Sequence, residues 1–238
     1  MTKPLALIVG VGASTGQALA RAWAPHYRLC LVARSATLVE TLATELADAT
    51  SYTCDVADQN SWAETLLAIK CDHGLPARIL INVESAAWGA YQDLSLSALA
   101  KSFEVNVVSV LQLVQTLYPA ANDIPPDTRL MVSSSPAAYN PPPRFLGLAP
   151  SRVAQRTLVE LLDQSLREHG LNCCVFSIDG AIDQPSMRTM LPDQPDEYFL
   201  KPAAIAAAME AAFAKDVFPR RSGIRGASAF GNPEDIVD

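Results

Sequence analysis

Three glycines lie close together near the N-terminus, with two hydroxyl side chains among them. The segment VGVGASTGQALARA contains Gly10, Gly12 and Gly16, and Ser14 and Thr15 precede the third glycine. Glycine lets a backbone turn tightly and approach a pyrophosphate, and the start of the next helix offers free N–H groups and a positive dipole end to an anion. Because the loop joins an apolar run to a helical pattern, it predicts a dinucleotide-binding turn. A tight turn without a ligand is the alternative.

The type of dinucleotide depends on the end of the second apolar run. An NAD site normally has Asp or Glu there, roughly 20 residues after the glycines, to bind the adenosine ribose 2′-hydroxyl. Here the stretch reads LVARSATL, and no carboxylate occurs between His26 and Glu40. Arg34 and Ser35 stand instead where a 2′-phosphate could accept charge-assisted hydrogen bonds. The sequence therefore favours NADP(H) over NAD(H), unless Arg34 is only a solvated loop residue.

The elements that must position these residues alternate in type. Short apolar runs predict strands over residues 5–9, 27–33, 51–56, 78–82, 129–135 and 171–179. Longer helical patterns cover residues 15–26, 35–49, 60–72, 97–118 and 151–170. This alternation implies βαβ units and a doubly wound parallel sheet, which is the three-layer α/β/α Rossmann fold. With no repeat, linker or composition shift, we expect one domain over residues 1–238.

Two irregular segments follow predicted strands, at residues 140–150 and 184–202. Ligands of open α/β sheets bind outside the carboxyl ends of the strands, so both segments are expected to border the site. The second carries Met187, Met190 and Phe199 among its apolar residues. It is predicted to form a lid over a small apolar ligand.

Composition and charge exclude several classes of function. Half of the 238 residues are hydrophobic, 18% are charged and the net charge is −7, which argues against nucleic acid and anionic membrane surfaces as partners. Neither a signal peptide nor a membrane span is expected. The cysteines lack zinc-ligand spacing, so no metal is expected. We interpret them as buried thiols in a reducing, cytoplasmic compartment: Cys30, Cys54, Cys71, Cys173 and Cys174.

An ordered series of short motifs then resembles a known family. After the glycine loop, with Ser14 at its middle glycine, come CDVAD with Asp55, ILINVES with Asn82, FEVNVVSV with Asn106, VSSS, and IDGAIDQP. In order and spacing these motifs resemble the short-chain dehydrogenase/reductases over roughly residues 4–190. The resemblance implies the Rossmann fold and a nicotinamide-dependent oxidoreductase.

The resemblance also assigns roles to single residues. It implies that Asp55 and Val56 border the adenine, and that Asn82, Val83 and Ile182 lie in cofactor-binding segments. Asn106 would hold a backbone kink and an ordered water of the proton relay, and Ser135 would hydrogen-bond the substrate carbonyl. Family members usually form dimers or tetramers through the helices that correspond to residues 97–118 and 151–169, so a homo-oligomer is expected.

The chain departs from the family at the residues that carry catalysis. Counted from Ser135, the family's catalytic tyrosine and lysine fall on Leu148 and Arg152. No lysine occurs between Lys101 and Lys201, so the YxxxK pair is absent whatever the alignment. Leucine has no proton to donate, and an arginine, with a pKa above about 12, is a poor acid.

Few residues could replace the missing acid. Tyr139, four residues after Ser135, could turn into the cleft, although a loop tyrosine is more often a packing residue. Glu84 could be a general base, but a salt-bridged or solvated side chain is favoured. Two hypotheses follow: an NADP(H)-dependent oxidoreductase that uses Ser135, Asn106 and Arg152 with an unorthodox proton donor and acts slowly, or a redox-inactive nucleotide-binding relative.

Overall fold

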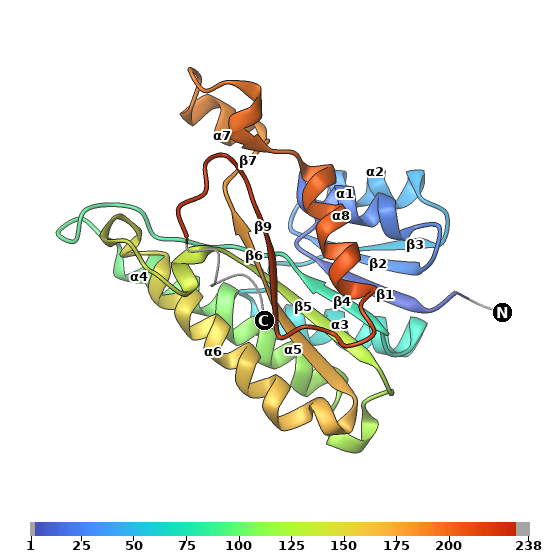
Figure 1. The fold of residues 1–238 in the computed structure, drawn as a ribbon. Coiled ribbons are helices and arrows are strands. Elements are labelled where there is room, and N and C mark those ends of the chain that lie inside the picture. The colour runs from blue at the N-terminus through green and yellow to red at the C-terminus, as the bar shows by residue number, and fades with distance from the viewer. Residues whose placement is uncertain (1–2, 232–238) are drawn as a thin grey trace.

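The computed structural model describes residues 3–231, and most of its strands form one parallel sheet. The strand order within these residues is β3-β2-β1-β4-β5-β6-β9, and each neighbouring pair is parallel (Figure 1). The strands are β1 (Leu5–Val9), β2 (Arg28–Ala33), β3 (Ala49–Thr53), β4 (Arg78–Ile81), β5 (Thr128–Ser134), β6 (Leu171–Asp179) and β9 (Arg221–Arg225). A separate two-stranded ladder joins β7 (Ala181–Ile182) to β8 (Phe199–Leu200).

Helices cover both faces of the sheet, which makes three layers (Figure 1). One face packs against α1 (Thr15–Trp23), α2 (Ala36–Glu45) and α8 (Pro202–Phe213). The other packs against α3 (Gln59–His73), α5 (Ser109–Leu117) and α6 (Ala149–Leu166), and α4 (Leu96–Phe103) leads into α5. Every residue of β1 and of β5 is buried, as expected for strands covered on both faces. The predicted Rossmann architecture is confirmed.

Several predicted boundaries shift for local reasons. The first helix ends at Trp23; Ala24 still has helical backbone, but Pro25 has no N–H with which to continue the helical hydrogen bonds. The third helix, α3, is preceded by Asp58, whose side chain accepts hydrogen bonds from the N–H groups of Asn60 and Ser61 (both 3.1 Å), and it is followed by Gly74, which has a positive φ of 86°. The third strand covers 49–53 instead of 51–56.

The helix predicted over 97–118 forms, but with an interruption. Residues Glu104–Val108 adopt a π-helical turn between α4 and α5, where Asn106 lies. By length and composition the stretch Leu96–Leu117 could cross a membrane, a test that core helices also pass. Its residues Val105, Val110 and Leu113 pack into the core beneath the sheet, so we describe it as a core helix.

The structure also contains elements that the sequence pattern missed. Helix α8 and strand β9 follow the last predicted segment, and β9 extends the sheet beside β6. One prediction about the thiols is wrong: Cys71 is exposed on α3, whereas the other four cysteines are buried. The buried face of α6 carries polar residues, among them Ser151, Arg152 and Gln155. These polar residues lead to the candidate site.

Candidate nucleotide-binding and active site

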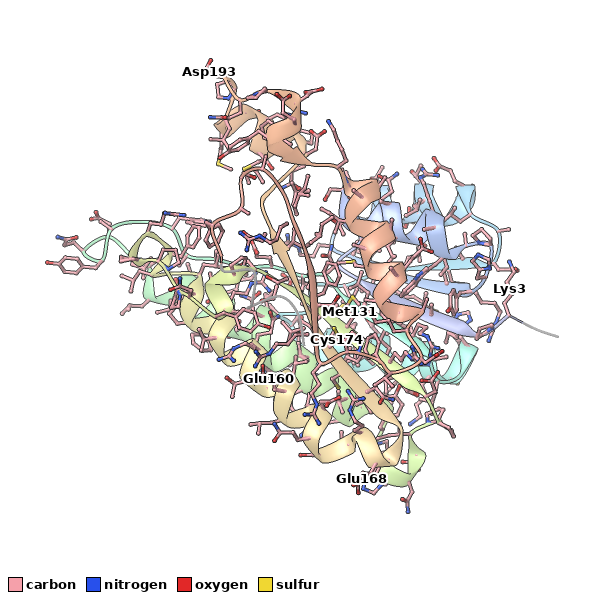
Figure 2. All side chains as sticks on the ribbon, in the orientation of Figure 1. Lys3, Met131, Glu160, Glu168, Cys174 and Asp193 are labelled. Carbon is pink, nitrogen blue, oxygen red and sulfur yellow. The ribbon has the colours of Figure 1, made fainter. Side chains whose placement is uncertain are left out.

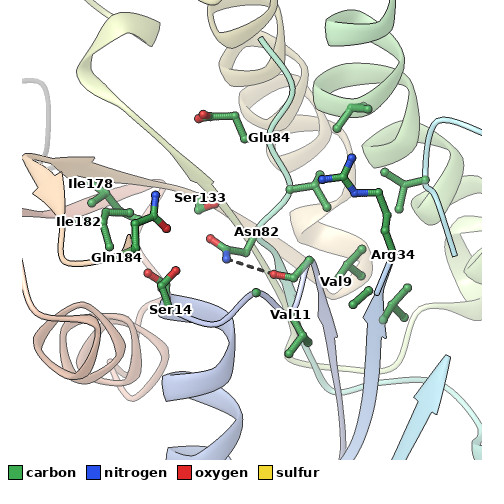
Figure 3. Close-up of a pocket in the computed structure, with 18 of the residues that line it drawn as sticks. Val9, Val11, Ser14, Arg34, Asn82, Glu84, Ser133, Ile178, Ile182 and Gln184 are labelled. Atoms are coloured by element: carbon green, nitrogen blue, oxygen red, sulfur yellow. Dashed lines mark hydrogen bonds between the residues drawn. The ribbon is translucent and has the colours of Figure 1, made fainter. Parts of the chain in front are cut away.

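A cavity of about 510 Å³ opens at the carboxyl ends of the strands. Its lining comes from the segments that follow β1, β2, β3, β4, β5 and β6. Figure 3 shows Ser14, Arg34, Asn82, Glu84 and Gln184 around it, and of these Asn82 and Glu84 share the segment that follows β4. The cavity therefore lies where an open parallel sheet is expected to bind ligands.

The glycine loop is shaped by close backbone packing at one glycine and by open space at another. Gly10 has a φ of +86°, and a Cβ there would clash with the carbonyl oxygen of Asn82 and lie 2.6 Å from its carbonyl carbon. Asn82 also donates from Nδ2 to the Gly10 carbonyl oxygen (3.3 Å; Figure 3). At Gly12, by contrast, a Cβ would meet no atom of the chain within 4 Å. Packing therefore demands glycine at position 10 but not at position 12.

The first turn of α1 faces the cavity with unused polar groups. Ser14 precedes the helix without a side-chain capping bond. The Thr15 side chain is 1% exposed, and its Oγ1 has no hydrogen-bond partner. Both residues line the cavity, whereas Gly16 lies behind them, where a Cβ would come within 2.8 Å of the Gly10 carbonyl oxygen. A helix N-terminus with free donors and an unpaired buried hydroxyl is suited to an anionic group.

Arg34 and Ser35 lie beside the cavity at the end of β2. Ser35 is the residue before α2 and makes no side-chain capping bond. Arg34 is exposed, and no ion pair to it occurs within residues 3–231. The nearby Asp55 pairs with Lys101 (3.3 Å). Partial burial opposes ionisation of Asp55, but bonds from the Ala57 N–H and Lys101 outweigh it and lower the pKa of this carboxyl.

Three serines form the cavity wall at the end of β5. Ser133, Ser134 and Ser135 all line the cavity, and the Oγ atoms of Ser134 and Ser135 are buried without hydrogen-bond partners. Their hydroxyl groups therefore keep unused hydrogen-bonding capacity at the cavity wall.

Arg152 occupies the floor of the cavity at this end. Its Nη1 donates to the Ser133 carbonyl oxygen (3.2 Å) and to Gln155 Oε1 (2.8 Å), and its Nη2 donates to Glu84 Oε2 (2.6 Å). The Arg152 side chain is 3% exposed and that of Glu84 is 53% exposed. Glu84 is thus salt-bridged, the favoured one of its two predicted roles.

Asn106 lies beneath the site instead of lining it. Its side chain is fully buried and exchanges hydrogen bonds with the backbone of Ser85, through Nδ2 to the carbonyl oxygen (2.8 Å) and from the N–H to Oδ1 (3.1 Å). Nδ2 also donates to Ser151 Oγ (2.9 Å). Asn106 therefore fixes the segment after β4 to α6 from inside the π-helical turn, which matches the backbone kink predicted for it.

The other catalytic candidates are not brought to the cavity. The Tyr139 ring lies between Arg156 and Arg221, 5.0 Å and 5.3 Å from its centroid, and its hydroxyl is buried without a hydrogen bond. Burial raises the pKa of this phenol. The prediction that Tyr139 could serve as the proton donor is therefore not supported, because the two arginines hold it outside the cavity lining. Leu148 is buried at the start of α6, and no tyrosine or lysine of the described chain lines the cavity.

Apart from Gly16, the remaining predicted cofactor residues also line the cavity, namely Gly10, Gly12, Val56, Val83 and Ile182. Sequence reasoning missed Val9, Val11, Leu38 and Ile178. Val9 and Val11 flank Gly10, so proximity to the glycine loop could have identified them. No group of three or more His, Cys, Asp or Glu side chains within residues 3–231 is placed to hold a metal.

The predicted lid is a projecting segment that reaches the cavity only at its base. Gln184 and Met187, at the start of α7 (Pro185–Met190), line the cavity, whereas Asp193 lies at the far tip (Figure 2). The base is held by Asp183, which pairs with Arg188 and Lys201 (both 2.7 Å). Hydrogen bonds from these two cations keep the pKa of the Asp183 carboxyl well below its usual range.

Comparison with known proteins identifies the family. A model of the short chain dehydrogenase family matches residues 4–193. The chain belongs to this family. The comparison with curated proteins gave no significant match. The motifs from the glycine loop to the end of β6 thus carry a family assignment that their order had predicted.

Solved structures share the fold of this chain at low sequence identity. An alcohol dehydrogenase from the archaeon Thermococcus sibiricus, complexed with 5-hydroxy-NADP, has a TM-score of 0.85 at 22% identity over 97% of this chain and 99% of its own. A short-chain dehydrogenase from Streptomyces avermitilis has a TM-score of 0.82 at 18% identity, and the match covers 95% of this chain and 89% of that one. A Pseudomonas aeruginosa RhlG/NADP active-site complex has a TM-score of 0.78 at 19% identity, and the match covers 96% of this chain and 97% of that one.

Proposed function

We propose that the cavity binds NADP(H) in preference to NAD(H). The observation that carries this proposal is the pair Arg34 and Ser35, a cation without an ion-pair partner in the described chain and an unused hydroxyl at the N-terminus of α2. Both cavity-lining carboxylates are already paired, Asp55 with Lys101 and Glu84 with Arg152. A phosphate on the 2′-position gains charge-assisted hydrogen bonds at Arg34, whereas a bare 2′-hydroxyl finds no free carboxylate there.

The other residues of the cavity fit a dinucleotide. The free donors at the start of α1, the buried unpaired Oγ1 of Thr15 and the open space beside Gly12 suit a pyrophosphate. Complexes with 5-hydroxy-NADP and NADP among the related folds support a nicotinamide cofactor of the phosphorylated type.

The chemistry we propose is a slow reduction of a small apolar carbonyl or oxidation of the corresponding alcohol. The nicotinamide cofactor supplies or accepts the hydride. Ser135 offers its unpaired hydroxyl to the substrate oxygen, while Ile178, Ile182 and Met187 give the cavity an apolar side. Without a tyrosine or lysine in this lining, no positioned acid delivers the proton. The absence of such an acid typically costs about 10²–10⁴ in rate.

A second candidate function is nucleotide binding without turnover, as in a regulatory relative. The observation that favours it is the Glu84–Arg152 ion pair, which occupies the floor where the family places its lysine. Arg152 donates hydrogen bonds from Nη1 and Nη2 to protein acceptors, and a guanidinium is not deprotonated in proteins, so it cannot act as the acid. In this case the chain would bind the nucleotide but would not catalyse hydride transfer.

Calorimetric titration with NADPH and NADH tests the cofactor proposal. We expect NADPH to bind more tightly than NADH, and Arg34→Ala to weaken NADPH by about 10- to 100-fold while changing NADH little. Arg21→Ala is the matched control, because Arg21 is an exposed arginine on α1 outside the cavity lining. Equal loss for both nucleotides in Arg34→Ala, or no binding by the unaltered protein, would overturn the proposal.

Turnover separates the two candidate functions. Multiple-turnover oxidation of NADPH with any of a panel of apolar ketones and aldehydes, lost in Ser135→Ala, supports the oxidoreductase. Tight NADPH binding with no turnover across the panel supports the redox-inactive relative.

We also propose a homodimer or homotetramer in a reducing, cytoplasmic compartment. Val108, Leu111 and Leu161 are exposed apolar residues on the helical layer formed by the π-helical turn, α5 and α6. A partner copy would cover them. None of the five cysteines forms a disulfide within residues 3–231, in keeping with a reducing environment.

A further inference from the structure

Glu84 and Arg152 belong to a closed ring of hydrogen bonds beneath the cavity. Arg152 donates to Glu84 and to Gln155 Oε1, and Gln155 Nε2 donates to the Asn106 carbonyl oxygen (2.7 Å). The Asn106 side chain then exchanges two hydrogen bonds with the backbone of Ser85, the residue after Glu84. Arg152, Gln155 and Asn106 are each buried to at least 98%. The ring therefore holds the Glu84 backbone and carboxylate in a defined position.

Two polar atoms of this ring have no partner among the described residues: Arg152 Nε, which is shielded from solvent, and Glu84 Oε1, which belongs to a half-exposed side chain. Arg152 bonds to Glu84 Oε2, and no described residue bonds to Glu84 Oε1. The Glu84 side chain is half exposed and lines the cavity, and Figure 3 shows its carboxylate pointing away from Arg34. What the ring presents to a ligand is therefore an acceptor. The ligand group must be a donor, such as a hydroxyl.

The position of Glu84 selects among the possible donors. Arg34 follows β2 and Glu84 follows β4, and β1 with the glycine loop lies between these two strands. Because neighbouring strands are about 4.8 Å apart, the two residues belong to strand ends separated by about 10 Å, on either side of the pyrophosphate turn. A dinucleotide whose 2′-phosphate lies at Arg34 extends its second half past the turn toward β4 and β5. The first polar group of that half is a ribose with two adjacent hydroxyls.

We propose that Glu84, held by Arg152, binds the hydroxyls of the nicotinamide-side ribose. A carboxylate accepts hydrogen bonds from adjacent ribose hydroxyls readily, which is the reason NAD sites use Asp or Glu at the adenosine ribose. This inference rests on the proposed NADP(H) function. It assigns to the ion pair a cofactor contact that the chain has built without the family's tyrosine and lysine.

Two ligands that differ by one half of the cofactor test the assignment by calorimetry. NADPH carries both riboses, whereas 2′,5′-ADP carries the adenosine ribose, its 2′-phosphate and one 5′-phosphate only. We expect Glu84→Gln to weaken NADPH about 10-fold, because a charged acceptor becomes a neutral amide, and to leave 2′,5′-ADP unchanged within about twofold. Glu84→Ala is expected to weaken NADPH by about 10- to 100-fold.

Three controls make the outcome specific. Glu84→Gln retains an amide oxygen that can accept from Arg152, so this variant keeps the ring if Glu84→Ala fails to fold; thermal melting checks both. Glu64→Gln removes an exposed carboxylate of α3 outside the cavity lining and should change neither affinity. Arg34→Ala should weaken both ligands, because each carries the 2′-phosphate.

The possible outcomes separate the two proposals. Unchanged NADPH affinity in Glu84→Gln would mean that Glu84 only neutralises Arg152, and this would overturn the inference. Equal weakening of both ligands would place the effect elsewhere in the cavity and would also overturn it. If the unaltered protein binds neither ligand, the proposed function fails, and the inference fails with it.

Discussion

Two glycines of the same loop should respond in opposite ways to alanine. At Gly10 the added Cβ meets the carbonyl carbon of Asn82 at 2.6 Å, and the φ of +86° is unfavourable for any residue with a Cβ. The conformational penalty is about 1–2 kcal/mol, and overpacking against backbone adds about 1–3 kcal/mol. Gly10→Ala should therefore lower the free energy of unfolding by roughly 2–5 kcal/mol. For a chain of this length that lowers Tm by roughly 5–15 °C.

Gly12 has neither constraint, since a Cβ there meets nothing within 4 Å and its φ lies outside the left-handed region. Gly12→Ala should leave the free energy of unfolding within about 0.5 kcal/mol of its starting value or raise it by up to about 1 kcal/mol. It should weaken NADPH strongly, because the methyl group enters the cavity. Urea denaturation without nucleotide measures the first effect.

Melting with NADPH at 100 times its Kd measures the second effect, where the starting protein should gain about 2.7 kcal/mol and Gly12→Ala should not. Comparable destabilisation in both variants would show that the loop is shaped by packing alone. Full NADPH stabilisation of Gly12→Ala would show that Gly12 does not serve the ligand. Either result would refute the distinction between the two glycines.

Three further predictions concern the lid, the helical layer and the excluded tyrosine. The depressed pKa of Asp183 means that its bonds to Arg188 and Lys201 persist above the ordinary carboxyl pKa of about 3.9 and are lost as the pH falls through the lower folded-state value. In the unaltered protein, hydrogen exchange of the backbone amides in residues 183–201 should therefore become faster only in strong acid. In Asp183→Asn, which lacks the carboxylate, the same amides should exchange faster already at neutral pH. Leu161→Asp should lower the mass measured by light scattering, and an unchanged mass rejects that interface. Tyr139→Phe removes a buried unpaired hydroxyl, so turnover and Tm should not fall; lost turnover would restore Tyr139 as the donor.

Much of the fold could be predicted because buried parallel strands are continuous apolar runs. LALIV and LNCCVFSID are visible in the sequence as β1 and β6 for this reason. Two late elements lack such signals. Helix α8 reads PAAIAAAMEAAF and is apolar around most of its surface, so no helical period stands out, and β9 reads RSGIR, a polar edge strand. Pairing with β6 creates β9, and that contact cannot be read from five residues.

The candidate site divides in the same way. Residues that reach the cavity from the end of a strand follow from topology, and Arg34, Asp55, Asn82 and Ser135 all line it. Interactions between side chains far apart in the sequence do not follow from it. Glu84 lies 68 residues before Arg152, and the sequence could only offer a salt bridge as one of two roles for it. Tyr139 lies outside the cavity lining, where its ring contacts Arg156 and Arg221. Arg221 belongs to β9, an element that was not predicted.

By the family resemblance Arg152 stands at the position of the catalytic lysine, and a buried arginine needs more partners than a lysine. A buried guanidinium brings five donors, and leaving a buried charge unpaired costs about 3–5 kcal/mol. Glu84 supplies the negative charge and Gln155 an acceptor oxygen that Arg152 needs, so the burial of Arg152 depends on both residues. Replacing Arg152 alone by lysine would remove the guanidinium donors to which Gln155 and Glu84 are now bonded. On our proposal, acceptors instead of an acid surround Arg152, so we expect this chain to bind NADPH and to turn it over slowly or not at all.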